Sequence, residues 1–260
     1  MFDTFDKKVI NLVKDGDFKN DIFANEVVWT YSIALLALNN SKIYEKLTGL
    51  KYIDTHNIFL EAQPKTIYSG LEGNSVIDLV AGAVAIREGT VSGIELLNHE
   101  KREVCFLEAK YNSDLSVKTS YCVIRNQMDR VLENLLTFRG NNIETTKVVF
   151  SLLTPRIYKD VYGSRIYSYK FDEYSKLLNF KNDVLAKKIE LPSNFQPNRI
   201  ENHSYEIEKS LNKLTMNWIT FEDLIEIEFD DVKNLDITNY SQAEKIWNRI
   251  RTKILKECKI

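Results

Sequence analysis

The sequence predicts an α/β fold, in which a central mixed β-sheet is flanked by helices and followed by a mainly helical C-terminal extension. Short β-branched and apolar runs cluster between residues 57 and 111, with Gly, Pro and Asn between them. Longer apolar segments, typical of buried helices, lie on either side of this cluster, at 17–39 and 121–138. One further apolar run, at 147–153, completes the order helix, strands, helix, strand. That order indicates a single mixed α/β core.

Composition excludes several other classes of protein. The 260 residues are 44% hydrophobic and 28% charged, which is ordinary for a globular protein and unlike a disordered one. The formal net charge of −2 excludes a generally basic DNA-coating protein, although a local basic stripe remains compatible with nucleic acid. Cys105, Cys122 and Cys258 are too few and too scattered for a disulfide framework or a zinc knuckle, so we expect a reducing, cytoplasmic setting. The first residues contain acids and no apolar stretch, so no signal peptide is expected.

The first half of the chain is expected to form a helix and then a set of short strands. The helix over 17–39 ends at Asn39-Asn40-Ser41, and its longest apolar stretch is too short to span a membrane. A short strand over 57–63 is stopped by Pro64. Three more strands are then expected to form a β-meander with close turns, at 75–86, 91–97 and 103–111.

The second half begins with the helix over 121–138, which Gly140 and two asparagines terminate, and with the strand over 147–153, which Pro155 stops. We therefore expect a core over 1–155 and a C-terminal extension over 156–260. Helices are expected in the extension, near 204–216, 220–228 and 241–258. Tyrosines lie between basic residues in 158–170, a mixture that suits either base stacking with phosphate contacts or a strand pair with one aromatic face.

The residues that carry chemistry are Asp78 in one predicted strand and Glu108-Ala109-Lys110 in another. Side chains at i and i+2 of a strand share a face, so Glu108 and Lys110 project together. If the two strands pair, the carboxylate of Asp78 meets that of Glu108. Burying two carboxylates is costly unless a cation neutralises them, and Mg²⁺ prefers such oxygen ligands. A bound Mg²⁺ polarises a phosphoryl oxygen and lowers the pKa of a water, which a neighbouring Lys can position. These are the parts needed for phosphodiester hydrolysis.

Val76-Ile77-Asp78, followed by Phe106-Leu107-Glu108-Ala109-Lys110, resembles the signature of the PD-(D/E)xK nuclease superfamily, which has the restriction-endonuclease-like fold. The resemblance covers roughly 20–155 and includes the order of elements. It implies that Asp78 and Glu108 bind Mg²⁺ (with Mn²⁺ as a substitute), that the backbone carbonyl of Ala109 joins them, and that Lys110 assists the attacking water.

The same resemblance assigns roles to residues on two helices. Glu26 matches the acid that many members carry on the first core helix, facing the metal. Gln127 matches the Gln that some members carry on the helix after the last of the three strands. Gln127 and Arg130, one turn later on the same face, are then expected to touch a phosphate or to hold Lys110, and both Arg130 and Arg125 are expected to contact the nucleic acid. Glu61 and Asp114 are outside candidates, and Asp114 also suits a turn.

Two features depart from the family pattern. Ile77 stands where a Pro usually precedes the Asp, and the spacing from Asp78 to Glu108 is long. We therefore expect an extra or extended hairpin between these two strands.

Together these features predict a Mg²⁺-dependent deoxyribonuclease, with an endonuclease in bacterial antiviral defence, restriction or DNA repair as the expected setting. DNA is the expected partner, with a homodimer or a separate helicase or sensor subunit as possible associates. Two alternatives stay open. One is a catalytically inactive module with the same fold that binds nucleic acid or a protein, and the other is an RNase on the same scaffold.

Overall fold

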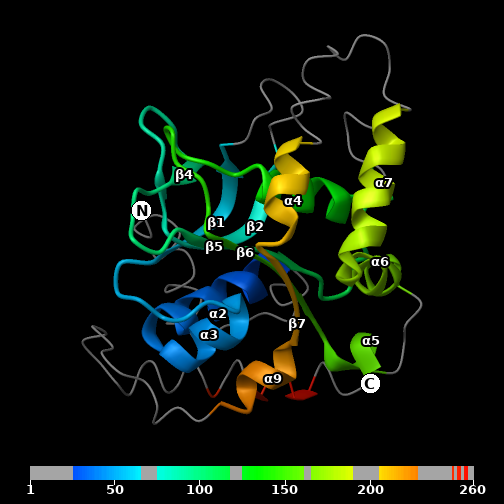
Figure 1. Ribbon diagram of the computed structural model, residues 1–260. Coiled ribbons are helices and arrows are strands. Elements are labelled where there is room, and N and C mark those ends of the chain that lie inside the picture. Colours follow the sequence, from blue (N-terminus) through cyan, green and yellow to red (C-terminus); the bar gives the residue numbers. More distant parts are fainter. Residues whose placement is uncertain are drawn as a thin grey trace.

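The computed structural model describes residues 26–65, 75–117, 125–160, 165–189 and 205–227, together with positions 248, 251–252 and 255–256. Through this described part runs a seven-stranded sheet with the order β3-β4-β1-β2-β5-β6-β7 (Figure 1). Its strands are β1 (Asn57–Pro64), β2 (Ile77–Gly82), β3 (Val84–Ile86), β4 (Gly93–Leu96), β5 (Glu103–Ala109), β6 (Lys147–Thr154) and β7 (Leu214–Thr220). The pairs β1–β2, β2–β5 and β3–β4 are antiparallel, whereas β1–β4, β5–β6 and β6–β7 are parallel. The predicted mixed sheet is confirmed.

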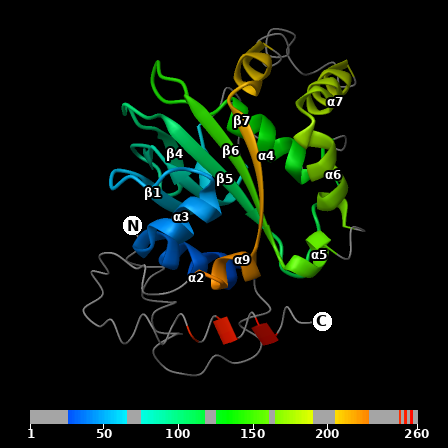
Figure 2. The same ribbon diagram turned by 60° about the horizontal axis from the view of Figure 1, so that its bottom comes forward.

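Helices cover both faces of this sheet (Figure 2). The helices whose bounds are defined are α2 (Glu26–Asn39), α3 (Ser41–Thr48), α4 (Gln127–Leu136), α5 (Arg156–Asp160), α6 (Ile166–Ser175), α7 (Leu177–Ile189) and α9 (Phe221–Ile225). Helices α2 and α3 pack on one face, and α4, α6 and α7 pack on the other. The predicted helix over 17–39 is confirmed from residue 26 onward, and 17–25 lie outside the described residues. Likewise, α4 confirms the helix expected over 121–138 from residue 127 onward.

Two separate apolar cores follow from the alternation of side chains along the strands. Neighbouring residues of β5 illustrate this, because Leu107 packs with Trp29 and Leu47 under α2 and α3, whereas Phe106 packs with Leu132 under α4. Both faces of β5 are therefore buried, and a polar side chain on this strand can reach solvent only at its end.

The expected meander is corrected in one respect. The strand predicted over 75–86 is divided into β2 and β3, and the following strand, β4, pairs with β3 and β1 rather than lying between β2 and β5. Gly82 explains the division, since its φ of 122° is open to glycine, and a Cβ there would collide with the carbonyl oxygen of Glu103. The β3–β4 hairpin is the extra hairpin that the long spacing predicts, and it leaves β2 and β5 as direct neighbours.

The C-terminal extension was expected to be mainly helical, yet it also supplies the edge strand β7. Residues 205–211 are helical as expected, but 214–216 belong to β7, which pairs with β6 along its whole length. Phe171 and Phe180, from α6 and α7, pack in the same core as α4. Among the described residues, the predicted boundary at 155 therefore separates neither two sheets nor two cores. The helix expected over 241–258 lies outside the described residues except at positions 248, 251–252 and 255–256, which are helical.

No helix among the described segments combines the length and the apolar character that crossing a membrane requires.

Candidate active site

Asp78 and Glu108 meet where β2 and β5 stop pairing. The last matched residues of the two strands are Leu79 and Leu107, so Asp78 and Glu108 are the next pair in the same antiparallel register. Side chains at facing positions share one face of a sheet. The backbone N–H of Ala109 donates to Asp78 Oδ2 at 2.9 Å, so this carboxylate, rather than a backbone carbonyl of β2, accepts from the end of β5. The predicted convergence of the two acids is confirmed.

Lys110 lies between the two carboxylates. Its Nζ is 3.1 Å from Glu108 Oε2 and 3.7 Å from Asp78 Oδ2. The Lys110 side chain is only 6% exposed, so the ammonium is held inside the protein by the two acids and is not a mobile surface charge. This contact follows from the i, i+2 spacing at the end of β5, where Lys110 directly follows the strand and projects to the same side as Glu108.

Helix α4 brings Gln127 to the same carboxylate. The helix starts here because Asn126 and Asp129 form a reciprocal capping box, in which each side chain accepts the other residue's backbone N–H. Gln127 is therefore the first helical residue, and its Nε2 donates to Glu108 Oε2 at 2.7 Å. Its backbone N–H donates to the Ser116 carbonyl at 3.0 Å. Gln127 therefore donates to the same carboxylate oxygen that accepts from Lys110.

Glu108 is buried and incompletely hydrogen-bonded. Its residue exposure is 0%, and its Oε1 has no hydrogen-bond partner in the structure. Burial has the largest effect on the pKa of this carboxyl, the Asp78 carboxylate adds to it and Lys110 opposes both, and the net result is a pKa raised to about 8. Burial alone would lower the pKa of the Lys110 ammonium, but Glu108 and Asp78 outweigh it and hold that pKa above its usual range. At neutral pH the favoured state is therefore a charged lysine beside a largely protonated Glu108.

These groups fit a hard divalent cation. Glu108 Oε1 has no hydrogen-bond partner, and the Asp78 contacts with the Ala109 N–H and with Lys110 both use Oδ2. The Asp78 side chain is 35% exposed, so the pair opens to solvent on that side. Two carboxylates with water completing the shell are a usual arrangement for Mg²⁺. Within the described residues, no group of three or more His, Cys, Asp and Glu side chains is placed to hold a metal.

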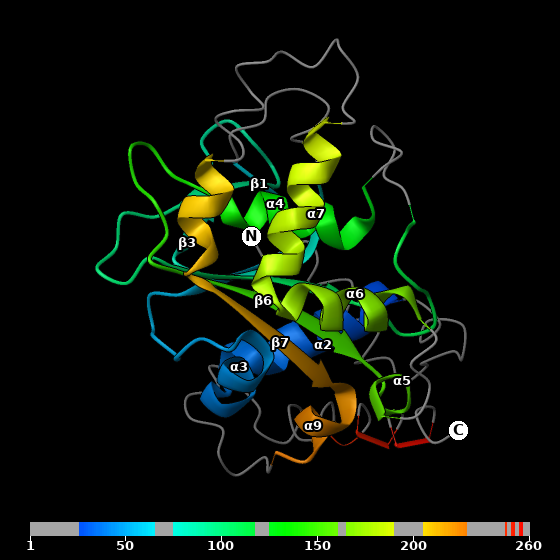
Figure 3. The same ribbon diagram turned by 45° about the vertical axis from the view of Figure 1, so that its right-hand side comes forward.

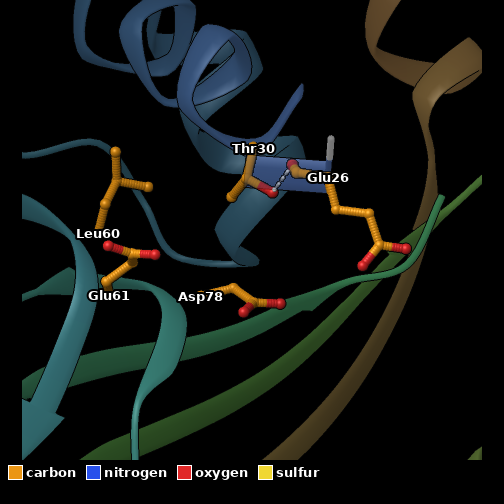
Figure 4. A pocket seen from close by; sticks show the side chains of 5 residues that line it. All are labelled: Glu26, Thr30, Leu60, Glu61 and Asp78. Atoms are coloured by element: carbon orange, nitrogen blue, oxygen red, sulfur yellow. Dashed lines mark hydrogen bonds between the residues drawn. The ribbon is translucent and has the colours of Figure 1, made fainter. Parts of the chain in front are cut away.

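Glu26 reaches the same region from the first turn of α2. It lines a pocket with Thr30, Leu60, Glu61 and Asp78, and Figure 4 shows the carboxyl groups of Glu26 and Asp78 extending to the same side of that pocket. Its Oε1 accepts from the Tyr111 N–H at 2.8 Å, the Ser113 N–H at 3.1 Å and the Ser113 hydroxyl at 2.6 Å. Glu26 therefore holds the loop that follows β5.

The two outside candidates have different surroundings. Glu61 lines the pocket with a φ of 47°, but its carboxyl group stands apart from that of Asp78 (Figure 4). Asp114 accepts the Ile166 N–H at 2.9 Å and the Tyr167 N–H at 3.3 Å, so it caps the start of α6. Neither the Asp114 cap nor the Ser113 contact has a signal in the sequence, because both depend on partners more than 50 residues away.

The two arginines predicted to contact nucleic acid make intramolecular contacts instead. Arg125 is 3% exposed, and its Nε lies 2.9 and 2.8 Å from the two carboxylate oxygens of Glu133. Arg130 is 8% exposed, and its Nε donates to the Ser75 hydroxyl at 2.9 Å. Arg125 thus stabilises the segment that leads into α4, and Arg130 connects α4 to the residues just before β2. The prediction that these two arginines contact nucleic acid is therefore corrected, because both side chains are buried.

The chain matches no protein-family model, no curated protein and no solved structure.

Proposed function

We propose that this protein is a Mg²⁺-dependent deoxyribonuclease with a restriction-endonuclease-like core, hydrolysing phosphodiester bonds at the Asp78–Glu108 pair. The observation that carries the proposal is the convergence of Asp78, Glu108, Lys110 and Gln127 at the point where β2 and β5 separate. Three of these residues belong to the motif that resembles the PD-(D/E)xK nucleases, and the fourth is the glutamine expected on the next helix.

Each residue has a distinct role in this proposal. Asp78 and Glu108 would hold the Mg²⁺ with the carbonyl of Ala109, and the bound ion supplies Lewis-acid stabilisation of the phosphoryl oxygens and a water of lowered pKa. Lys110 lies within 4 Å of both carboxylates and is placed to orient that water. Gln127 fixes the Glu108 carboxylate through Oε2, which leaves Oε1 available to the ion. Glu26 positions the loop after β5 and supplies a carboxylate to the outer shell.

Energetics favours an active site over a structural ion pair. A buried carboxylate without full hydrogen bonding costs free energy, and replacing such a group with an apolar one is often neutral or stabilising. The orphaned Oε1 of Glu108 is such a cost. A divalent cation would remove it, whereas a module that only binds a partner on its surface has no use for a fully buried acid.

The test is cleavage of a supercoiled plasmid and of an RNA of similar length, each with Mg²⁺ and with EDTA. The variants are Asp78→Asn, Glu108→Gln and Lys110→Ala, and the matched control is Asp54→Asn, which removes an exposed aspartate on the loop before β1. We expect Mg²⁺-dependent DNA cleavage that falls by about 100-fold or more in each site variant and not in the control.

The alternatives give different results in the same experiment. Cleavage of RNA alone would identify an RNase on this scaffold. Retardation of DNA without any Mg²⁺-dependent cleavage would identify a binding module. Cleavage that persists in EDTA or in the Asp78→Asn variant would refute the proposed chemistry.

A further inference from the structure

Two cations on α5 and at the start of α6 have no carboxylate partner among the described residues. These are Lys159 and Arg165. The neighbouring cations differ, since Arg156 pairs with Asp223 and Glu226, and Lys170 pairs with Glu173. Helices α5 and α6 lie near the edge of the sheet that β6 and β7 form (Figure 3).

Each of these two cations lies against an aromatic ring. The guanidinium carbon of Arg165 is 4.6 Å from the centroid of the Tyr158 ring, and the Nζ of Lys159 is 5.9 Å from that of Trp218. Tyr169 lies in the first turn of α6, four residues after Arg165, and is 63% exposed. We call Tyr158, Lys159, Arg165 and Tyr169 the stacked-cation surface.

This surface is joined to the proposed active site by the loop 111–114. An Arg165 Nη1 donates to the Asn112 carbonyl at 3.2 Å, and Asp114 caps the start of α6. Asn112 follows Lys110 by two residues, which span at most about 7 Å. Glu26 holds the other side of the same loop through Ser113. A strand bound at the Arg165 guanidinium therefore needs only a few nucleotides to extend to the Asp78–Glu108 pair.

Two cations that lie against partly buried rings, with the exposed Tyr169 ring on the helix that follows, suit one class of ligand. A guanidinium without a carboxylate partner can bind a phosphate through two parallel hydrogen bonds, and a neighbouring ring holds it flat. An exposed tyrosine can stack on a base, but only where that base is unpaired. An acidic protein surface would use the cations but would give Tyr169 no planar partner.

We propose that the stacked-cation surface binds an unpaired nucleic-acid strand beside the cleavage site, with Arg165 and Lys159 on phosphates and Tyr169 on a base. This inference rests on the proposed nuclease function, and it adds that the substrate contains a single-stranded segment. Its test, however, measures binding without cleavage.

The experiment measures fluorescence anisotropy of a labelled 20-nucleotide oligodeoxythymidine and of a 20-base-pair duplex. The protein carries Asp78→Asn throughout, in EDTA, over a range of salt concentrations. Arg165→Ala and Tyr169→Ala should each weaken binding of the single strand by roughly 5- to 50-fold. Arg165→Ala should also reduce the slope of log affinity against log salt by about 0.7, whereas Tyr169→Ala should leave that slope unchanged.

Two further variants keep the test specific. Arg165→Lys retains the charge and should recover the salt slope but only part of the affinity, because a lysine lacks the planar fork. Lys170→Ala removes a cation from the same helix that is already paired with Glu173, and it should bind as the parent does. Thermal melting of each variant excludes loss of folding as the cause.

The outcomes separate this inference from the nuclease proposal. Single-strand affinity that is unchanged in Arg165→Ala and Tyr169→Ala overturns the surface, even if the parent protein cleaves DNA with Mg²⁺. Tighter binding of the duplex than of the single strand also overturns it. A third result is single-strand binding that depends on Arg165 and Tyr169 while the protein with Asp78 intact shows no Mg²⁺-dependent cleavage. That result supports the proposed binding surface and refutes the proposed nuclease function.

Discussion

Replacing Glu108 by Gln should change how the stability of the metal-free protein depends on pH. The carboxyl has an ordinary pKa of 4.5, and burial in the folded protein raises it to about 8. Between these two values the unfolded chain has released a proton that the folded protein still holds. The stabilising contribution of the protonated Glu108 is therefore complete below pH 4.5 and is lost as the pH rises through about 8. Glutamine carries no such proton and lacks this dependence.

The magnitude follows from the two pKa values. At about 1.4 kcal/mol for each pH unit between them, the wild-type protein should lose at most about 5 kcal/mol relative to Glu108→Gln. In the wild-type protein Lys110 does not add to this slope, because Glu108 and Asp78 hold its pKa above its usual range and it stays charged throughout. The difference between the two free energies of unfolding should therefore move in favour of the variant as the pH rises from 5 to 8.

The assay is urea unfolding in EDTA at several pH values from 5 to 9, followed by tryptophan fluorescence. Trp29 is buried against the face that α2 covers, so its emission should report the loss of packing. The relevant quantity is the difference between the two free energies of unfolding at each pH, since titrations common to both proteins cancel in it. A difference that stays constant within about 1 kcal/mol from pH 5 to pH 8 would refute the account of Glu108 as a buried, mostly protonated acid.

Three other predictions rest on contacts and backbone angles in the structure. Mg²⁺ must displace the Glu108 proton. The affinity for Mg²⁺, measured by titration calorimetry, should therefore rise up to tenfold for each pH unit from about 5 to 8 and then level off. An affinity that does not change with pH would contradict this. Gly82→Ala should lower the free energy of unfolding by about 3 kcal/mol in a urea titration, because φ is 122° there and a Cβ meets Glu103, while Gly89→Ala, with open space around it, should cost less. The Tyr174 hydroxyl contacts Asp129 and Asp183, so Tyr174→Phe should leave two carboxylates facing each other and cost about 1 to 3 kcal/mol; an unchanged melting temperature would contradict that.

The local pattern of the sequence was sufficient to predict the strands that build the site. β1, β5 and β6 lie where the sequence predicts them, and β2 occupies the first part of the strand expected over 75–86. The facing of Asp78 and Glu108 was also predictable, because it needs only strand alternation and one assumed pairing. Pairing partners are not local, however, so nothing in 91–97 indicates that β4 leaves the meander to lie beside β1.

Other features carry weaker signals. The alternation Leu-Thr-Met-Asn-Trp-Ile-Thr over β7 has the period of a strand and would have predicted one, but the helical interpretation of 204–216 took precedence. The burial of Arg125 depends on Glu133, eight residues later, and such a pair looks the same in sequence as two solvated charges. Likewise, the three bonds that Glu26 accepts come from a loop 85 residues away or more, which no helical periodicity can indicate.

The place of β7 at the edge of the sheet has a consequence for synthesis of the chain. Strand β6 ends at Thr154 and its outer neighbour begins at Leu214, roughly 60 residues later. At about 5 to 20 residues per second, a ribosome needs on the order of 3 to 12 seconds to deliver that neighbour. During this interval β6 is an unpaired edge strand. Its only charged residue is Lys147, so little in its sequence opposes pairing with a strand of another molecule. A fragment ending at residue 155 would keep that exposed edge permanently, so it should aggregate where the longer chain does not.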